Sequence, residues 1–239
     1  AIRTRAVRDG DDWVLNGQKT WTTLAQHADW CFVLARTDPT AKKQLGISFI
    51  LVDMKTPGIK VRPIADLTGH EHFNEVVFTN VRVPRDALIG KRGDGWKQVM
   101  GELAFERSGP ERFLSSFTVF AELLRKTGPQ PDVRAAIEIG KVAARIAVLR
   151  RMSLSVAGML QSQQDPGLQA ALVKDLGASL EQEIPEIVRR VVPVEPQPHG
   201  PDPFAAALAY TIQHAPSFSI RGGTREILRG IIARGLGLR

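Results

Sequence analysis

The stretch NEVVFTNVRVPRDALIGKRGDGW, residues 74–96, lies where the sequence changes from a β pattern to a helical pattern. Its first ten residues are rich in Val and Phe, which favour β-strands. After the turn signal GDG, apolar side chains recur at helical spacing, with Trp96, Val99 and Leu103 on one face. The sequence therefore predicts a β domain over residues 1–90 and a helical domain over residues 91–239.

The first of these domains contains several short apolar runs between turns that carry Pro, Gly or Asp. These runs predict strands at residues 2–7, 30–36, 46–53, 59–64 and 74–83. The dipeptide Asn16-Gly17 is typical of a tight hairpin turn and is expected to reverse the chain after a strand that ends at Leu15. Five or six short strands without a helix between them predict an antiparallel β-sandwich or barrel.

The second domain reads as a helical bundle. Residues 133–163 carry Ala, Ile, Val, Leu and Met at helical spacing, and residues 167–192 continue in the same style with a break expected at Pro185. Asp202 is expected to cap a helix that ends before Pro216, and a last helix is expected after Thr224.

Composition excludes some classes of protein and leaves others open. The chain has 239 residues, of which 43% are hydrophobic, enough for one large domain or two small ones. The single cysteine, Cys31, excludes an internal disulfide and suits a reducing cytoplasm. A net charge of +7 suits nucleic acid or a phosphate-rich ligand, but the basic residues are dispersed, which disfavours nucleic acid. No apolar run reaches the roughly 18 residues of a membrane span.

The stretch NGQKTWTT, residues 16–23, has residues that suit a planar ligand. Trp21 is able to stack on a flat ring, while Thr22 and Thr23 are able to hydrogen-bond its edge. The same residue types are also what an ordinary β-strand prefers. The pattern by itself leaves both interpretations open.

The stretch GELAFERSGPERF, residues 101–113, contains a candidate general base. Glu106 follows Glu102 and Leu103 by one helical turn, so its side chain is expected to face an apolar surface, where a carboxylate is suited to take up a proton. The alternative is a solvated glutamate paired with a nearby arginine.

Near the end of the sequence, Gly222 and Gly223 permit a close backbone approach, and Thr224 is a natural N-cap for the helix that follows. Free N–H groups at such a helix start attract phosphate or ring oxygens. The alternative is an ordinary glycine loop that ends in a capped helix. His70 and His72 suggest a metal site, but no third or fourth ligand stands at a recognisable spacing, so no metal is expected.

In this order, the stretches resemble the acyl-CoA dehydrogenase family. The resemblance rests on LNGQKTWTT with the AD that follows, on GISFILVDMKTPGIKVRPI, on NEVVFTNVRVPRDALIG with GDGW, and on GGTREILRGIIAR. It implies an α+β fold in which part of the middle β domain precedes a C-terminal four-helix bundle. The family's N-terminal helical domain and its Thr-Glu-Pro…Gly-Ser-Asp segment are not in this sequence, which suggests a truncated, cleaved or partial chain.

The resemblance also implies a chemistry. Members of the family bind FAD and dehydrogenate acyl-CoA thioesters between Cα and Cβ. A carboxylate removes the α proton, and the β hydrogen leaves as hydride to flavin N5. By resemblance, Trp21, Thr22 and Thr23 line the isoalloxazine ring, and Thr224 and Glu226 contact FAD.

The same resemblance assigns the base. In many members the residue before the last Gly-Thr is the catalytic glutamate, but here that residue is Gly222. In the branch that includes isovaleryl-CoA and long-chain dehydrogenases, the base directly precedes an arginine on the first helix of the C-terminal domain. The pair Glu106-Arg107 matches that position. Glu106 is therefore the predicted base, Arg107 supports the substrate site, and the Gly222 N–H polarises the thioester carbonyl.

Two elements of the family are not recognisable. LLRKTGPQPDVRAAI replaces the Arg-x-x-Phe-Gly element, and EQEIPEIVRRVVPVEPQP replaces the Gln-x-x-Gly-Gly element. Both elements normally contact FAD across a dimer interface. Their replacement fits a divergent bacterial branch in which some members pair active with inactive subunits and accept bulky acyl groups such as steroid side chains.

The sequence thus predicts a cytoplasmic, FAD-dependent acyl-CoA dehydrogenase of fatty-acid or side-chain β-oxidation. Its expected partners are an acyl-CoA substrate, an electron-transfer flavoprotein as electron acceptor, and further subunits of a homo- or hetero-oligomer. Nucleic acid and membrane are not expected. Two alternatives stay open, namely a structural subunit with impaired catalysis in a hetero-oligomer, and an acyl-CoA oxidase that uses O2.

Overall fold

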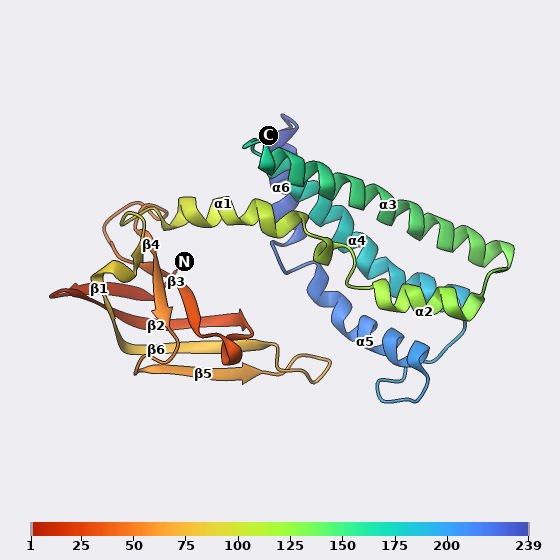
Figure 1. Cartoon of the computed structure of the whole chain (residues 1–239), viewed down its shortest axis with the longest axis horizontal. Coiled ribbons are helices and arrows are strands. Elements are labelled where there is room, and N and C mark those ends of the chain that lie inside the picture. The colour runs from red at the N-terminus through yellow and green to blue at the C-terminus, as the bar shows by residue number, and fades with distance from the viewer. Residues whose placement is uncertain (1, 239) are drawn as a thin grey trace. The chain divides into compact units, whose positions relative to one another are not determined.

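The computed structural model describes residues 2–238, apart from the side chain of Ala104. The chain divides into two compact units, residues 1–101 and 102–239 (Figure 1). The predicted domain ranges include the two terminal residues, which lie outside the described part. The division falls within helix α1 (Gly95–Ser108), later in the chain than the predicted boundary after residue 90.

The first unit contains one seven-stranded sheet with the strand order β5-β6-β2-β1-β3-β4-β7. Its strands are β1 (Arg5–Asp9), β2 (Asp12–Thr23), β3 (Trp30–Arg36), β4 (Ile47–Asp53), β5 (Ile59–Ile64), β6 (Phe73–Pro84) and β7 (Leu88–Ile89). Two short 3-10 helices, η1 (Ala25–His27) and η2 (Arg85–Ala87), lie between strands. The strands predicted from residue 30 to residue 83 are confirmed to within one residue at their starts and ends.

Among the described strands, five of the six pairings are antiparallel as predicted, but they do not form the predicted sandwich or barrel. The sheet is single, its strand order runs from β5 to β7, and β1 meets β3 in parallel where Arg5 pairs with Arg36. Figure 1 shows β3 and β4 crossing the direction of β2, β5 and β6. Because the sheet bends in this way, side chains from both halves reach one shared core, which includes Leu15, Val33 and Phe78.

The hairpin predicted at Asn16-Gly17 is also wrong, because β2 continues through both residues. The register of β2 against β6 shifts between Leu15 and Gly17, so Asn16 lies opposite two residues of β6, Thr79 and Asn80, in a β-bulge. The Asn16 side chain accepts the Asn80 N–H at 2.9 Å and donates to Asn80 Oδ1 at 3.0 Å. Gly17 has a φ of 141°, and a Cβ there would lie 2.6 Å from the Thr4 Cα. The glycine therefore serves a close strand approach instead of a turn.

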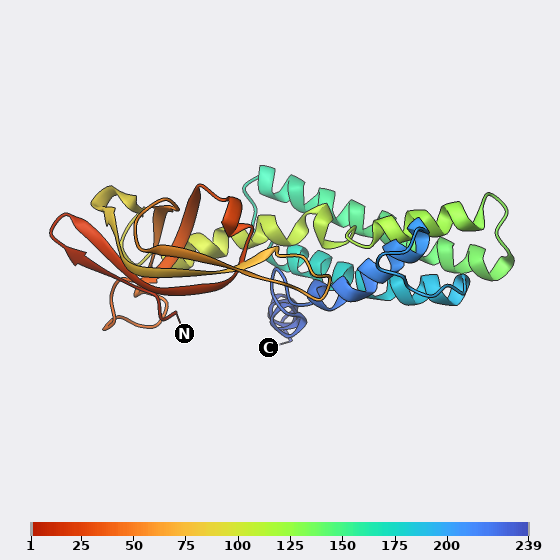
Figure 2. The same cartoon turned by 90° about the horizontal axis from the view of Figure 1, so that it is seen from below.

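The second unit is built from helices. After α1 and a 3-10 turn η3 (Pro110–Arg112) come α2 (Phe117–Thr127), α3 (Val133–Gln161), α4 (Gly167–Val191), α5 (Pro203–Phe218) and α6 (Arg225–Gly235). Helix α4 contacts each of α2, α3, α5 and α6 (Figure 2). Its buried face supplies residues such as Val173, Leu180 and Val188 to the core of the unit. Helix α4 is therefore the central element of this unit.

The predicted helix break at Pro185 is wrong, because α4 runs through it to Val191. A proline lacks the N–H that would bond the carbonyl four residues earlier, here that of Glu181. The Ser116 hydroxyl donates to this carbonyl at 2.7 Å instead. Helix α5 likewise continues through Pro216 to Phe218, three residues beyond its predicted end. A hydrogen bond from another element thus replaces the bond that the proline at residue 185 removes.

The predicted cap at Asp202 is confirmed, since its Oδ1 accepts the Phe204 N–H at 3.0 Å. Asp132 caps α3 in the same way, with its Oδ1 accepting the Ala135 N–H at 2.8 Å. Thr224 occupies the N-cap position of α6 with extended backbone angles, but its hydroxyl makes no capping hydrogen bond to the helix backbone.

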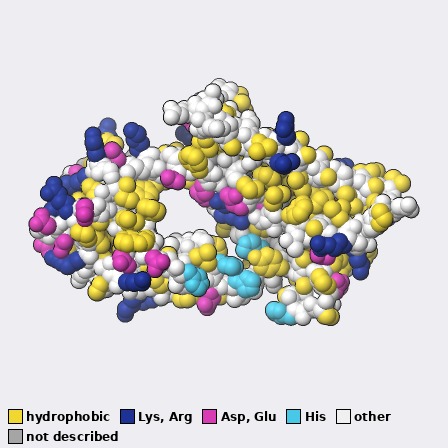
Figure 3. Space-filling model, in the orientation of Figure 1, with side chains coloured by type: hydrophobic (Ala, Val, Ile, Leu, Met, Phe, Trp, Pro, Cys, Tyr) yellow, Lys and Arg dark blue, Asp and Glu magenta, His cyan; other side chains and the backbone are white. Residues whose placement is uncertain are grey.

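Large hydrophobic side chains are exposed on the helical unit. Figure 3 shows hydrophobic side chains gathered on the visible face of this unit. Exposed side chains of this kind include Phe117 and Leu124 on α2 and Val133 and Ile137 on α3. Contiguous exposed apolar side chains are typical of a surface that another protein covers.

Gly177→Ala is expected to destabilise the protein by about 2 kcal/mol, although alanine favours helices. Gly177 is buried in α4, and a Cβ there would lie 2.3 Å from the carbonyl oxygen of Arg112. The matched control is Gly140→Ala on α3, where a Cβ meets no atom within 4 Å, and a gain of about 0.5–1 kcal/mol is expected. Urea denaturation measures both. A Gly177→Ala protein as stable as the control would contradict the close packing of η3 on α4.

Candidate active site

The loop between α5 and α6 brings distant parts of the helical unit together. Gly222 and Gly223 adopt φ values of 66° and 106°, a region that favours glycine. A Cβ at Gly222 would lie 3.4 Å from Lys174 Cε, 3.5 Å from Arg112 Cζ and 3.5 Å from Glu106 Oε1. The predicted base and the predicted oxyanion donor, far apart in sequence, are thus neighbours in space.

Glu106 lies in the last turn of α1, and its carboxylate is paired with an arginine. Its Oε1 lies 2.8 Å from Arg112 Nη2, and its side chain is 43% exposed. The expectation that this side chain faces an apolar surface is therefore wrong, because η3 turns Arg112 back onto the end of α1. Glu106 is thus a partly exposed glutamate paired with an arginine, which is the alternative that the sequence left open.

Arg107 holds the glycine loop. Its guanidinium is buried, and Nε donates to the Gly222 carbonyl at 3.1 Å. Burial lowers the pKa of Arg107 from its ordinary value, and the negative charge of Glu106 partly opposes that shift. The hydrogen bond fixes the orientation of the peptide unit that follows Gly222.

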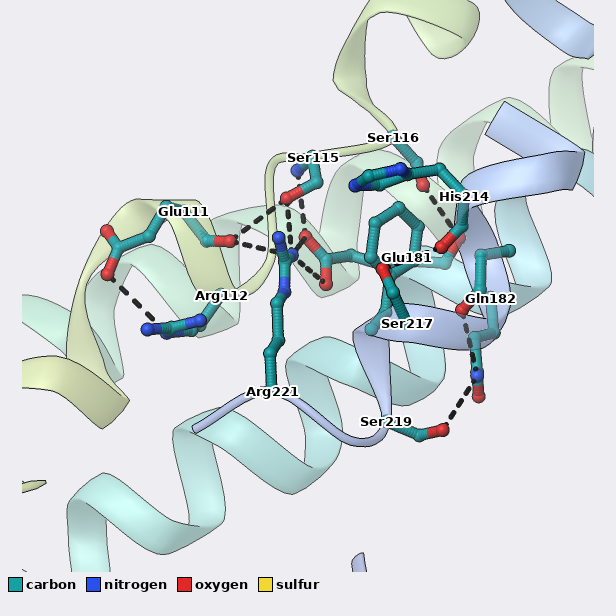
Figure 4. Close-up of polar contacts among 12 residues, drawn as sticks. Glu111, Arg112, Ser115, Ser116, Glu181, Gln182, His214, Ser217, Ser219 and Arg221 are labelled. Carbon is teal, nitrogen blue, oxygen red and sulfur yellow. Dashed lines mark hydrogen bonds and ion pairs between the residues drawn. The ribbon is translucent and has the colours of Figure 1, made fainter. Parts of the chain in front are cut away.

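A buried charge cluster lies behind this loop (Figure 4). Glu181 on α4 is fully buried, and its Oε1 accepts the Ser115 N–H at 2.8 Å. Arg221 donates to both carboxylate oxygens of Glu181, at 3.2 and 3.1 Å, and also to the Ser115 hydroxyl. Lys174, two turns earlier on α4, is fully buried and donates to the Phe218 carbonyl at 2.6 Å.

Lys174 and Glu181 were not among the residues that the sequence patterns predicted. The signal was present, because the two charged residues stand seven positions apart on the otherwise apolar face of α4. Charged residues in such places are rarely fully buried unless they are paired. A buried pair at that spacing therefore predicts a polar cluster inside a helical unit.

The pKa of Lys174 predicts a pH-dependent stability. Burial, and next the positive charge of Arg221, lower the pKa of this amine from 10.5 to about 8. Between these pH values the unfolded chain holds a proton that the folded chain has lost, so the free energy of unfolding rises with pH in that window. The gain is up to about 3 kcal/mol. Lys174→Met removes the titrating amine and with it this gain in stability. The stability difference between wild type and variant is therefore expected to grow from pH 8 to pH 10.5.

Urea denaturation at several pH values measures that difference, in which the titration of all other groups cancels. Lys126→Met, at an exposed position near the end of α2, is the matched control and is expected to show no such growth. A constant difference between wild type and Lys174→Met across the window would contradict the prediction.

The predicted ring-binding segment lies in the β unit. Trp21 is 65% exposed and has a φ of 64°, in the left-handed region that bulky residues rarely adopt. It occupies a register shift of β2 against β6 between Lys19 and Thr22, and its ring meets Phe73 edge to face. Asn74 donates to the Thr22 carbonyl at 3.2 Å, and Thr23 pairs with Phe73. The bulge thus turns the indole toward solvent.

At the start of α6, Thr224 and Glu226 interact with each other. Glu226 is exposed, and its own backbone N–H, followed by the Thr224 hydroxyl, holds the pKa of its carboxyl below the ordinary value. An ionised carboxylate in the first turn of a helix is stabilised by the helix dipole.

The rings of His70 and His72 contact each other edge to face, with centroids 5.2 Å apart. Among the described residues, no group of three or more His, Cys, Asp or Glu side chains is arranged to hold a metal ion. Across residues 2–238, no helix combines the length and the apolar character that crossing a bilayer requires.

Comparison with known proteins identifies relatives along the whole chain. Acyl-CoA dehydrogenase IpdE1 of Mycobacterium tuberculosis is 35% identical over 247 residues, which span all of this chain and 63% of the relative. Acyl-CoA dehydrogenase FadE34 of the same organism is also 35% identical, over 99% of this chain and 32% of the relative. The chain thus spans less than two thirds of either relative.

Solved structures share the fold. The Tcur3481-Tcur3483 steroid ACAD G363A variant matches with a TM-score of 0.88 and 26% identity, over 100% of this chain and 65% of that one. The ChsE4-ChsE5 complex from Mycobacterium tuberculosis matches with a TM-score of 0.84 and 28% identity, over the same shares.

Two family domains match in succession. Residues 1–81 match the acyl-CoA dehydrogenase middle domain, and residues 123–237 match the acyl-CoA dehydrogenase C-terminal domain. The α+β architecture, with a seven-stranded sheet followed by helices, agrees with both matches. The chain belongs to the acyl-CoA dehydrogenase family, whose members are FAD-dependent oxidoreductases.

Proposed function

We propose that this chain is the part of an FAD-dependent acyl-CoA dehydrogenase that carries the catalytic base, and that the whole protein introduces a Cα=Cβ double bond into an acyl-CoA thioester. The observation that supports this most directly is the proximity of the Glu106 carboxylate to Gly222, because the reaction needs a base and a carbonyl-polarising N–H close together. Helices α2 to α5 would form the four-helix bundle of the family's C-terminal domain.

The residues of the β unit fit a flavin. An exposed indole held in a strained bulge offers a flat face for stacking, and the hydroxyl groups of Thr22 and Thr23 offer partners for ring-edge atoms. Thr224 and Glu226, which interact at the start of α6, would supply further polar contacts. When bound, FAD would supply the acceptor for the β hydride.

The chain's own residues would perform the proton chemistry. The ionised carboxylate of Glu106 would take the α proton of the thioester on one of its oxygens. The N–H of Gly222 would donate to the thioester carbonyl oxygen, where negative charge develops as the proton leaves. Arg107 would keep that loop in place through its hydrogen bond to the Gly222 carbonyl. Arg107 thus supports the substrate site without contacting the reacting atoms.

Partners and surroundings follow from the same proposal. The exposed hydrophobic side chains of α2 and α3 support assembly into an oligomer, and the replaced family elements favour a hetero-oligomer. Two of the similar structures are the Tcur3481-Tcur3483 steroid ACAD G363A variant and the ChsE4-ChsE5 complex. We propose a bulky acyl-CoA as substrate in lipid side-chain β-oxidation, an electron-transfer flavoprotein as acceptor, and the cytoplasm as location.

Anaerobic titration of the full-length protein tests the proposal. The protein is purified alone and together with proteins encoded next to it, its FAD content is measured, and butyryl-CoA, octanoyl-CoA and a steroid side-chain CoA ester are added. Loss of the oxidised flavin absorbance with one of them, and formation of the enoyl-CoA, is the expected result. Absence of FAD from every preparation would contradict the proposal.

A second candidate is a structural subunit of a hetero-oligomer with impaired catalysis. The replacement of both family elements that contact FAD across the dimer interface favours it. Under this alternative, FAD binds only when the partner is present, and Glu106 variants do not affect turnover. Production of H2O2 in air at the rate of substrate oxidation would instead identify the protein as an acyl-CoA oxidase.

A further inference from the structure

We propose that Arg112 is a positioning residue that holds the Glu106 carboxylate in place for removal of the substrate proton. The inference rests on the proposed function, because Glu106 must be the base for its orientation to matter. The sequence left open that a nearby arginine pairs with Glu106, but it did not single out Arg112, which lies beyond the predicted helix, in the 3-10 turn η3.

Arg112 holds Glu106 at two points. Its Nη2 donates to the carboxylate Oε1 at 2.8 Å, and its Nε donates to the backbone carbonyl of the same residue at 2.9 Å. The two bonds fix both the main chain and the side chain of Glu106 relative to one rigid guanidinium. Only 9% of Arg112 is exposed, so water competes weakly for these bonds.

The backbone of Arg112 is itself anchored. Its N–H donates to the Gly109 carbonyl at 3.0 Å, and its own carbonyl packs against Gly177 of α4 at a distance that leaves no room for a Cβ. The next residue, Phe113, is buried in the core of the helical unit. The guanidinium therefore ties the last turn of α1 to the central helix through a rigid connection.

Other charged groups also surround Glu106. Arg107 is its neighbour on α1, Lys174 on α4 lies beside the same glycine, and the Glu111 carboxylate in η3 lies 3.5 Å from Arg112 Nε. Arg112 is the group that an ion pair of 2.8 Å joins to the Glu106 carboxylate. Removal of Arg112 is therefore expected to disturb the position of the Glu106 carboxylate more than removal of the others.

Arg112→Gln in the full-length, FAD-loaded protein tests the inference, with the acyl-CoA that reduces the wild-type flavin. The maximal rate of flavin reduction is expected to fall about 10- to 100-fold, while the acyl-CoA concentration that gives half the maximal rate stays within about twofold of wild type. Arg112→Lys keeps the charge but not the two-point geometry. Its rate is therefore expected to stay low.

Arg125→Gln is the matched control, because Arg125 also pairs with a glutamate, Glu122, but on the exposed surface of α2. It is expected to leave both the maximal rate and the half-saturating acyl-CoA concentration unchanged. A wild-type maximal rate of flavin reduction in Arg112→Gln would overturn the inference while the proposed function stands.

A second readout does not depend on activity. Melting temperatures are measured for Arg112→Gln, Glu106→Gln and the double variant, each compared with wild type. The sum of the two single-variant losses in melting temperature is expected to exceed the loss in the double variant, because each single substitution removes the same ion pair. Additive losses would overturn the inference. If the losses are non-additive but no acyl-CoA reduces the flavin, the ion pair is supported and the proposed function is rejected.

Discussion

Glu106→Gln is expected to lower the rate of flavin reduction by acyl-CoA roughly 10²- to 10⁴-fold, the usual contribution of a general base. Glutamine has nearly the same shape and still accepts the hydrogen bond from Arg112, which lies 2.8 Å from the native carboxylate. It does not accept a proton from the substrate. FAD content and melting temperature are therefore expected to change far less than the rate. Stopped-flow absorbance under anaerobic conditions measures the effect.

Glu102→Gln is the matched control, since Glu102 lies one turn earlier on α1 and is exposed. It is expected to retain the wild-type rate. A Glu106→Gln protein that reduces its flavin within about twofold of wild type would remove Glu106 from the role of base. It would leave the family membership untouched, because that rests on the matches along the whole chain.

Glu181→Leu is expected to lower the free energy of unfolding by about 3–5 kcal/mol, the usual cost of removing one partner of a buried ion pair. The substitution leaves the Arg221 guanidinium without its carboxylate and leaves the Ser115 N–H without an acceptor. It also removes the negative charge that favours the protonated form of Lys174. The Arg221 guanidinium, the Ser115 N–H and the Lys174 amine would thus each lose a favourable interaction with the Glu181 carboxylate. Urea denaturation followed by circular dichroism measures the loss.

The matched control lies two residues further along α4. Glu183 is half exposed and pairs with Arg145 of α3, so Glu183→Leu is expected to cost less than about 1 kcal/mol. A Glu181→Leu protein that loses no more stability than this control would contradict the structural importance of the cluster. In the double variant Glu181→Leu/Arg221→Met, part of the loss is expected to return, since no unpaired guanidinium remains.

Local patterns predicted the regular elements well, because those elements depend on nearby residues. The four strands between residues 30 and 83 follow from apolar runs between turns, and the Asp202 cap follows from one side chain and the N–H two residues on. The predictions failed where a distant residue supplies the deciding contact. Asn16 bonds Asn80 across the sheet, and the Ser116 hydroxyl satisfies the carbonyl that Pro185 leaves without a partner in α4.

The candidate site divides in the same way. The sequence alone pointed to Glu106, Arg107, Gly222 and Thr224 through their resemblance to a family, and the proximity of Glu106 to Gly222 agrees with it. It was wrong about the surroundings of Glu106. Arg112 pairs with that carboxylate only because η3 reverses the chain and packs on α4 at Gly177. No local pattern encodes such a reversal.

The sequence by itself therefore determined the family and the order of strands and helices, because each motif and each periodic run can be read from residues that are close together in the chain. The tertiary structure decided which charges meet. Lys174, Glu181 and Arg221 lie on different parts of the chain, and Glu181 and Lys174 are both fully buried. Their ionisation and stability depend on the distances between elements, and only the packing of α4 against the loop and η3 determines those distances.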